Sequence, residues 1–574
     1  MQKTIMACLA FCIIASLSLP TAQAKKKSQV DHRPRLLKAM AAEMDRSMKN
    51  LKMDGFETPY FVAYEMKDIE NHRIEARYGA VYSSGGGKDR RLRVEVRVGN
   101  YEFDNIGKKN RSFDFSFSPG YTIKRNGPLD PDPEALRNSL WQLTDATYKG
   151  ALKAYLKLKS QKVTEVDDGE WAGSFSKEKT TQNVQASQDL DFDKEQWEKL
   201  ARSTTAVFEK HPEIFDSRMT IDGSKEVRYL VTSEGTRLIS ERILYNLSVF
   251  AATRAKDGML LTNQMTLYAR GPKDLPSHKD LMKQVKQLIA DLKALRQAPV
   301  LEPYTGPAIL DGDATGVLFH EVIGHRLEGE RQLDDHEGKT FKGQVGKKII
   351  PAFLSIIDDP TLVAMEGIKL NGTYAYDDEG VKAQKVVLVE KGVLRNFLTS
   401  RTPIKGFLKS NGHGRSSPGS RPRARMGNTI VLSDQMISIS ELKKRLLEEV
   451  KRQDKPYGLL IKNIVGGSTH TSTWGYQAYK GIPQLVYRIF PDGREELVRG
   501  VEIVGTPLTS INKIVATSDR ISVFNGFCGA ESGYVPVSAA APDVLMTEVE
   551  LQRSMKISEK SQILPSPWTG ASKK

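Results

Sequence analysis

Apolar residues recur at every third or fourth position in several long stretches of the chain, the spacing that gathers them on one face of an α-helix. This spacing predicts helices over residues 34–51, 135–158 and 277–297. A further helix is predicted after residue 438, because Ser438 and Glu441 form a capping box ahead of a new apolar stripe.

Strict alternation between apolar and charged residues predicts a second kind of element. Leu92, Val94 and Val96 alternate with Arg93 and Glu95, which is typical of a strand that buries one face and exposes the other to water. Strands are expected at residues 60–66, 74–82 and 91–98, and in an antiparallel stretch over 226–260.

The composition changes after the proline-bearing segment 298–307, where glycine-rich loops, short strands and hairpin signals replace the long periodic stretches. A chain of 574 residues is also too long for a single core. We therefore predict an α+β protein of two domains, an N-terminal α/β layered domain with an antiparallel sheet and a C-terminal, mainly-β, barrel-like domain. The expected ranges are 25–298 for the first domain, 299–555 for the second and 556–574 for a flexible tail.

The first 24 residues have the organisation of an export signal. Lys3 supplies the positive start, positions 5–19 are apolar, and Ala22-Gln23-Ala24 forms a small-residue cleavage site. The apolar stretch is shorter than the roughly 20 residues that a membrane-spanning helix needs. We expect cleavage before Lys25, a periplasmic or secreted protein and no transmembrane segment after cleavage; an uncleaved anchor is the alternative.

The charge of the chain is strongly positive, with a formal value of +15. Its 85 lysines and arginines are spread among 70 acidic residues, without an arginine-rich arm or a cluster of base-stacking aromatic residues. We therefore expect a solvated basic surface and no nucleic-acid partner.

Cysteine usage limits the covalent chemistry of the exported protein. Cys8 and Cys12 lie inside the predicted signal, so Cys528 is the one cysteine of the mature chain and cannot form an intramolecular disulfide. It lies in a glycine-punctuated segment, which we expect to be a loop that presents the side chain to a site. A metal ligand, a nucleophile and a small buried apolar residue are the three interpretations.

One motif points to metal chemistry: His320, Glu321 and His325 form a His-Glu-x-x-x-His sequence on a predicted helix. Five residues of a regular α-helix would leave the two imidazoles about 140° apart, too far for one metal. We therefore expect a π-type turn at Gly324 that lets them converge, with Glu321 beside them. Zinc favours a thiolate as a further ligand, and Cys528 can supply it; a chance match with two structural histidines is the alternative.

Residues 316–329 read GVLFHEVIGHRLEG and resemble the zinc helix of the TldD/PmbA metalloprotease family, also called modulators of DNA gyrase. Further resemblances follow in the same order over about residues 34–553: SEGT at 233–236, YDDEG at 376–380, VEKGVL at 389–394, RARMGNT at 423–429, and Cys528-Gly529 followed by VPV at 535–537.

The resemblance implies a zinc-dependent metallopeptidase in which His320, His325 and Cys528 bind Zn2+ and Glu321 serves as general base. It also implies an unfolded peptide substrate and a dimer, formed either by two copies of this chain or with a related subunit. Ala530 stands where the family often has a lysine after Cys-Gly, so the resemblance implies that a substrate-positioning or loop-positioning contact of the family is missing here.

Outside this core motif the predicted roles rest on single residues. Candidate substrate contacts are His413, Arg423, Arg425 and Asn428. The acidic run 377–379 orients a histidine, binds the substrate amine or is a charged turn, and the same interpretations apply to Glu328 and Glu330. Two other functions stay open: a cysteine peptidase that uses Cys528 as nucleophile, and a non-catalytic envelope protein that binds peptides or assembles and keeps zinc for folding.

Overall fold

The computed structural model of the chain describes residues 31–107, 122–162, 169–334, 339–469, 471, 479–554, 564 and 566–570. The predicted export signal and most of the predicted tail lie outside these ranges. Within them, no helix is both long enough and apolar enough to cross a membrane.

A seven-stranded sheet forms the N-terminal layer, in the order β3-β2-β1-β5-β6-β4, with β7 paired to another part of β6. Its strands are β1 Pro59–Arg77, β2 Ala80–Val98, β3 Thr122–Asn126, β4 Gln182–Val184, β5 Ile214–Thr232, β6 Arg237–Arg254 and β7 Leu260–Ala269. All its pairings are antiparallel except that of β4 with β6. The predicted antiparallel sheet is confirmed.

The first two strands are longer than their sequence pattern predicted. β1 and β2 pair along almost their whole length through a two-residue turn at Tyr78 and Gly79, which both have positive φ (45° and 73°). This is the turn geometry that matches the twist of a β-hairpin. The predicted strand at 74–82 therefore spans this turn. The sequence pattern missed it, because the alternation of side chains continues through the turn.

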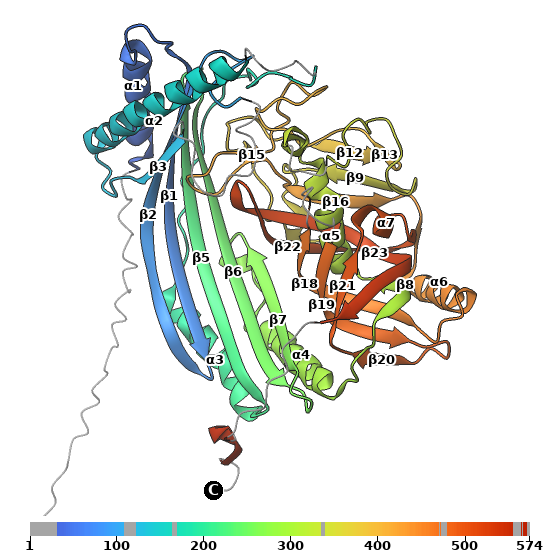
Figure 1. Cartoon of the computed structure of the whole chain (residues 1–574). Helices are drawn as coiled ribbons and strands as arrows, with labels where there is room; N and C mark the ends of the chain where they lie inside the picture. Colours follow the sequence, from blue (N-terminus) through green and yellow to red (C-terminus); the bar gives the residue numbers. More distant parts are fainter. Residues whose placement is uncertain are drawn as a thin grey trace, which may run out of the picture.

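Four helices pack on this layer: α1 Arg33–Asn50, α2 Pro133–Lys162, α3 Lys194–Thr205 and α4 His278–Gln297. Helices α1 and α2 cover one end of the sheet, and α3 and α4 lie toward the other (Figure 1). The apolar stripe of α1 packs with Val62, Tyr64 and Val94 of the strands in one core. The helical periodicity located α1, α2 and α4 to within a few residues.

The charged face of β2 was predicted to be exposed to water, but it is buried. Arg93 and Arg97 are 3% and 1% exposed, and Glu95 lies between them, 2.9 Å and 2.8 Å from their guanidinium groups. Arg97 also forms an ion pair with Asp104 at 2.8 Å. C-terminal loops cover this face, and the charges are buried as pairs, since an unpaired charge would be costly there.

The C-terminal layer is a twelve-stranded, mainly antiparallel sheet that closes on itself. Its ring runs β23-β21-β19-β18-β8 and returns to β23, because β8 pairs with both β18 and β23. The principal strands are β8 Tyr304–Leu310, β9 Leu354–Asp358, β12 Val386–Glu390, β13 Val393–Leu394, β16 Asn428–Ser433, β17 Met436–Ile437, β18 Gly458–Thr469, β19 Tyr479–Ile489, β20 Glu495–Val498, β21 Val501–Gly505, β22 Ile514–Ala530 and β23 Gly533–Arg553. The predicted mainly-β, barrel-like domain is thereby confirmed.

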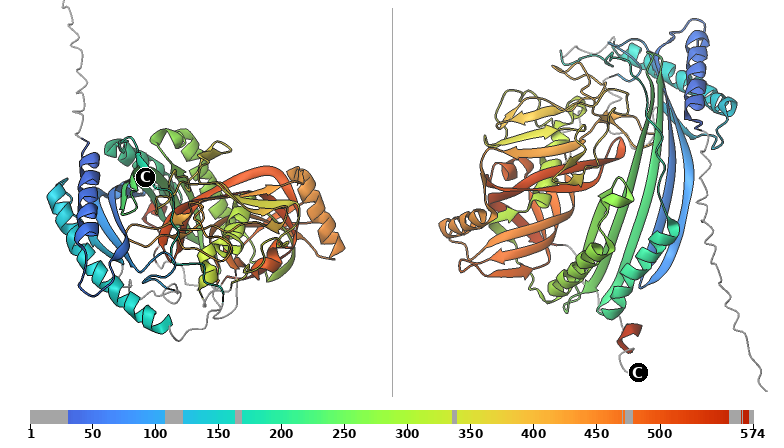
Figure 2. Two further views of the ribbon diagram at one scale, coloured as in Figure 1. Left: turned by 90° about the horizontal axis from the view of Figure 1, so that it is seen from above. Right: turned by 180° about the vertical axis from the view of Figure 1, so that it is seen from behind.

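Three α-helices of the described residues accompany this barrel, the shortest being α7 Pro507–Ile511. Helix α5 Gly312–Val322 follows β8 directly and packs against β18, β22 and β23. Helix α6 Ile439–Arg452 begins where its capping box predicted, since the Ser438 hydroxyl accepts a hydrogen bond from the backbone N–H of Glu441. The two layers lie side by side, with β7 and α4 facing the barrel (Figures 1 and 2).

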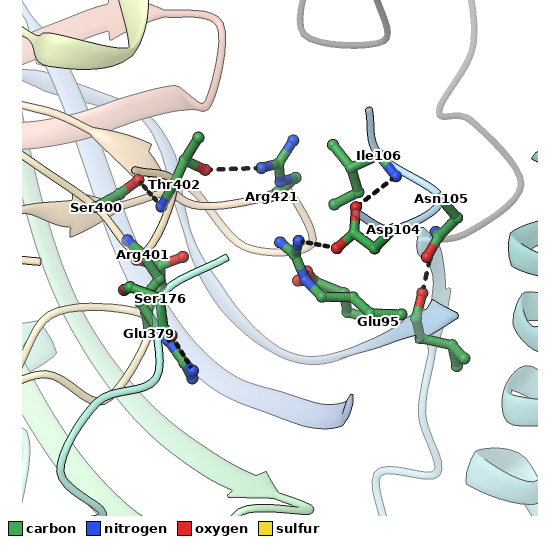
Figure 3. Close-up of polar contacts among 12 residues, drawn as sticks. Glu95, Asp104, Asn105, Ile106, Ser176, Glu379, Ser400, Arg401, Thr402 and Arg421 are labelled. Carbon is green, nitrogen blue, oxygen red and sulfur yellow. Dashed lines mark hydrogen bonds and ion pairs between the residues drawn. The ribbon is translucent and has the colours of Figure 1, made fainter. Parts of the chain in front are cut away.

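The layers are joined by a buried arginine. Arg401, 2% exposed, forms a two-pronged ion pair with Glu234 at 2.8 Å. It also donates to the carbonyl oxygen of Ser176 at 2.6 and 3.0 Å (Figure 3). Its guanidinium carbon lies 3.9 Å from the ring centre of Phe175, which the guanidinium group of Arg97 contacts at 3.6 Å. These contacts fix the C-terminal loops on the N-terminal sheet.

Candidate metal centre

Helix α5 presents the predicted motif, but it ends in a different way from the one we expected. Asp311 caps its first turn by accepting from the Ala314 N–H at 2.9 Å. The α-helix stops at Val322, and a 3-10 turn over Gly324–Leu327 follows, so no π-type turn is needed. A side chain at position 324 would overlap the sulfur of Met426, which explains the glycine by close approach.

This change of helix type brings the two histidines together. The ring centres of His320 and His325 are 5.0 Å apart, with the planes at 84°. Cys528 joins them: its Sγ lies 3.3 Å from Nε2 of His325, and one donor atom from each of the three residues falls within 4.8 Å of the others. All three side chains are buried.

Cys528 reaches the site from a strand, whereas we predicted a loop. It lies in β22 and pairs with Val535 of β23. The neighbouring Gly529 lets the ring of Tyr534 lie close to the backbone, since a side chain there would be 2.7 Å from that ring. The glycine beside Cys528 therefore allows close packing within the β22–β23 hairpin and does not mark a flexible loop.

A carboxylate behind His325 orients its ring. Glu328 lies 3.0 Å from Nδ1 of His325 and accepts a hydrogen bond from Nε of Arg331 at 2.9 Å. Burial would raise the pKa of Glu328, but the neighbouring His325, Arg331 and Arg425 lower it, so the group is ionised. An ionised acceptor at Nδ1 places the imidazole proton there and leaves Nε2 free to bind a metal.

The electrostatics of the three donors also suit a cation. Burial would raise the pKa of the Cys528 thiol, but His325 and His320 hold it well below its usual range. A thiolate and two imidazoles are the ligand types that zinc prefers, and three protein ligands with an open position are typical of catalytic zinc sites. The residues present therefore fit a zinc ion.

Glu321 lies next to these donors and faces open space. Its Oε2 is 4.0 Å from Nε2 of His325, and its side chain packs on Gly467 of β18. The predicted ligands and Glu321 all line a cleft of about 1590 Å³ between the two layers. Strand β7 and helix α4 form one wall of the cleft, and α5, β18 and β22 contribute the other.

The four predicted substrate contacts are not among the residues that line this cleft. His413 is fully buried and lies 3.2 Å from Asp358, and Asn428 donates to the carbonyl oxygen of Asp359. Arg423 stands in a short strand, Arg423–Ala424, beside a separate small pocket.

Arg425, the remaining predicted substrate contact, lies behind the metal centre. Its Nη2 donates to the carbonyl oxygen of Cys528 at 2.7 Å, and its Nε is 3.3 Å from Glu328. Arg425 thus supports two residues of the site, a role that sequence reasoning missed. The i, i+3 spacing of His325 and Glu328 was the available signal for the carboxylate; Arg425 carried none, because its partners are distant in sequence.

The acidic run forms a turn at the domain contact. Asp377 accepts from the N–H groups of Glu379 and Val381 within this turn. Asp378 forms an ion pair with Arg228 of the N-terminal sheet. Of the interpretations of this run, the charged turn is therefore the one that fits this geometry.

Comparison with solved structures identifies the fold. The chain superposes on a modulator of a DNA gyrase from Thermotoga maritima with a TM-score of 0.60 at 15% identity, covering 90% of this chain and 99% of that one. It superposes on TldE from Thermococcus kodakarensis with a TM-score of 0.58 at 13% identity, covering 90% and 100%. At these identities the likeness concerns the fold.

Sequence comparison identifies the C-terminal domain. Residues 303–553 match the model of the PmbA/TldA metallopeptidase C-terminal domain, the part of the chain where the family motifs were predicted to be strongest. A metalloprotease of Methanothermobacter thermautotrophicus is 33% identical over 44% of this chain and 52% of its own length. A zinc metalloprotease TldD homolog of Saccharolobus solfataricus is 27% identical over 46% and 57%. The chain thus spans about half the length of these relatives.

Proposed function

We propose that this chain is a zinc-dependent metallopeptidase that hydrolyses peptide bonds in extended or unfolded polypeptides. The observation that carries the proposal is the convergence of His320, His325 and Cys528 beside Glu321 on the floor of an open cleft. The relatives named metalloproteases, one of them a zinc metalloprotease, support this proposal.

The chemistry follows from the position of each group. A bound zinc ion would polarise the scissile carbonyl and make water a better nucleophile near neutral pH. Glu321 takes the proton from the attacking water and delivers it to the leaving amine, which is the work of a general base that then acts as acid. Glu328 holds His325 in one tautomer, and Arg425 holds the strand that carries Cys528.

The wall opposite the site favours an extended substrate. In the described residues β7 pairs with β6 alone, so its other edge faces the cleft. The carbonyl oxygen of Gln264 points to that side, where it accepts from the Gln484 side chain at 2.6 Å. Backbone groups alternate along a strand, so those of Thr266 and Tyr268 point the same way. An extended peptide can pair with such an edge irrespective of its side chains.

A cysteine peptidase is the second candidate, and one observation favours it. Cys528, His325 and Glu328 form a chain of contacts at 3.3 Å and 3.0 Å that resembles a nucleophile, a base and an orienting acid. His320 and Glu321 would have no role in such a mechanism, whereas both have one in the zinc peptidase.

Two measurements on the mature protein separate these functions. With unfolded casein as substrate, we expect a chelator such as 1,10-phenanthroline to abolish cleavage and added zinc to restore it. Cleavage that resists the chelator but is lost on thiol alkylation would assign the cysteine mechanism. No cleavage under any condition, with zinc bound, would favour the non-catalytic peptide-binding protein.

The setting of the enzyme is part of the proposal. We propose an exported protein that works as a dimer, on the strength of the signal-like first 24 residues and of the family resemblance. N-terminal sequencing of the protein from a periplasmic or secreted fraction, and its mass in solution, test these two points.

A further inference from the structure

A buried tyrosine, Tyr479, lies close to Glu321 of the candidate metal centre. Tyr479, in β19, is 1% exposed, and its hydroxyl oxygen has no hydrogen-bond partner among the described residues. Leaving a buried hydroxyl unpaired costs on the order of 1–3 kcal/mol. A phenylalanine would fill the same space without that cost, so packing does not explain the hydroxyl.

The position of this hydroxyl group is set by two glycines that face each other on neighbouring strands. Gly467 of β18 pairs with Gly481 of β19, so their side-chain positions lie on the same face, about 5 Å apart. The Tyr479 hydroxyl occupies the space that a side chain at Gly481 would fill. The Glu321 side chain occupies the corresponding space at Gly467, with Cγ at 2.8 Å and Oε1 at 3.2 Å from the missing Cβ. The phenol and the carboxylate therefore share one gap in the sheet face.

We propose that Tyr479 is a positioning residue for the peptidase reaction: its hydroxyl donates a hydrogen bond to the Glu321 carboxylate when that carboxylate turns toward the attacking water. Tyr479 does not line the cleft and so acts through Glu321, not on the substrate. The inference rests on the proposed function of Glu321 as general base. In support, burial raises the pKa of Tyr479 well above its usual range and the nearby Glu321 raises it further, so the phenol keeps its proton as a donor.

The experiment compares Tyr479→Phe with a matched control, Tyr304→Phe. Tyr304 lies in the same domain, and its hydroxyl already donates to the carbonyl oxygens of Pro307 and Tyr457. For Tyr479→Phe we expect unchanged zinc content, a melting temperature equal to or above that of the wild type, and a kcat on casein about ten-fold lower at similar KM. For Tyr304→Phe we expect the reverse, a lower melting temperature with unchanged kcat.

A second comparison tests that the hydroxyl acts through Glu321. Glu321→Asp withdraws the carboxylate by one methylene, so Tyr479→Phe should cause no further loss in that background. Full kcat in Tyr479→Phe, or a fall in melting temperature matching that of Tyr304→Phe, would overturn the inference. A wild-type protein without chelator-sensitive cleavage would instead overturn the proposed function itself.

Discussion

Replacing Glu328 with glutamine tests whether the carboxylate behind His325 prepares the site for zinc. Glu328 is 2% exposed and serves three partners: one oxygen contacts Nδ1 of His325 at 3.0 Å and Nε of Arg331 at 2.9 Å, and the other lies 3.3 Å from Arg425. A glutamine can keep one acceptor, but its amide then turns N–H donors toward a guanidinium group. The substitution also removes the negative charge that fixes the tautomer of His325.

The size of the effect follows from these contacts. Loss of a carboxylate that orients a metal ligand costs about 10–100-fold in affinity, or about 1.4–2.8 kcal/mol. Unfolding free energy should also fall, by about 1–3 kcal/mol. The loss stays moderate because Arg331 keeps Glu531 at 2.8 Å and Arg425 keeps the Cys528 carbonyl oxygen.

Zinc affinity is measured by competition with a coloured chelator, and stability by denaturant unfolding of the metal-free protein. Glu330→Gln is the matched control, because Glu330 is also buried but contacts Ser400 and the Ala424 N–H instead of a ligand. Wild-type affinity in Glu328→Gln, or an equal loss in Glu330→Gln, would refute the role assigned to Glu328.

Three further substitutions probe stability at defined points. Burial raises the pKa of Asp313 from 3.8 to about 6, so the ionised carboxylate destabilises the folded state increasingly as pH rises from about 4 to 6. Asp313→Asn should therefore raise the free energy of unfolding by up to about 3 kcal/mol at pH 8 and by nothing at pH 3.5, and an equal gain at both pH values would contradict this. Arg401→Met leaves Glu234 buried without its charged partner, with only the Tyr101 hydroxyl donating to it, and should cost about 3–5 kcal/mol in urea unfolding; a cost below 1 kcal/mol would show that the domain contact does not need this pair. Gly324→Ala forces a methyl group onto Met426 and should lower both the melting temperature and the zinc content, and normal values for both would show that the turn tolerates a side chain.

The parts of the fold that sequence patterns predicted well are those decided by local interactions. The stripes of α1, α2 and α4 and the capping box of α6 depend on residues three or four apart, and the structure has these helices at the predicted places. The β1–β2 turn carried no distinct signal, since Tyr78 is an unusual residue at positive φ. The burial of Arg93 and Arg97 could not be predicted from β2 alone, because the loops that cover them lie elsewhere in the chain.

The same division holds for the metal centre. The motif of His320 and His325 could be recognised in the sequence, and metal binding required the two rings to converge. The 3-10 turn that brings them together depends on the packing of Met426 against Gly324, which the sequence does not show. The place of Arg425 behind Cys528 depends on β22 and the 423–429 segment meeting in space. Contacts of that kind join residues about a hundred positions apart and leave no periodic trace in the sequence.

The most direct test of the zinc-peptidase assignment is to measure zinc per chain together with casein cleavage in the wild type, Glu321→Ala and Cys528→Ser. We predict about one zinc per wild-type chain, full zinc without cleavage in Glu321→Ala, and loss of both in Cys528→Ser. A wild-type protein that binds no zinc, or cleavage that survives in Glu321→Ala, would contradict the assignment.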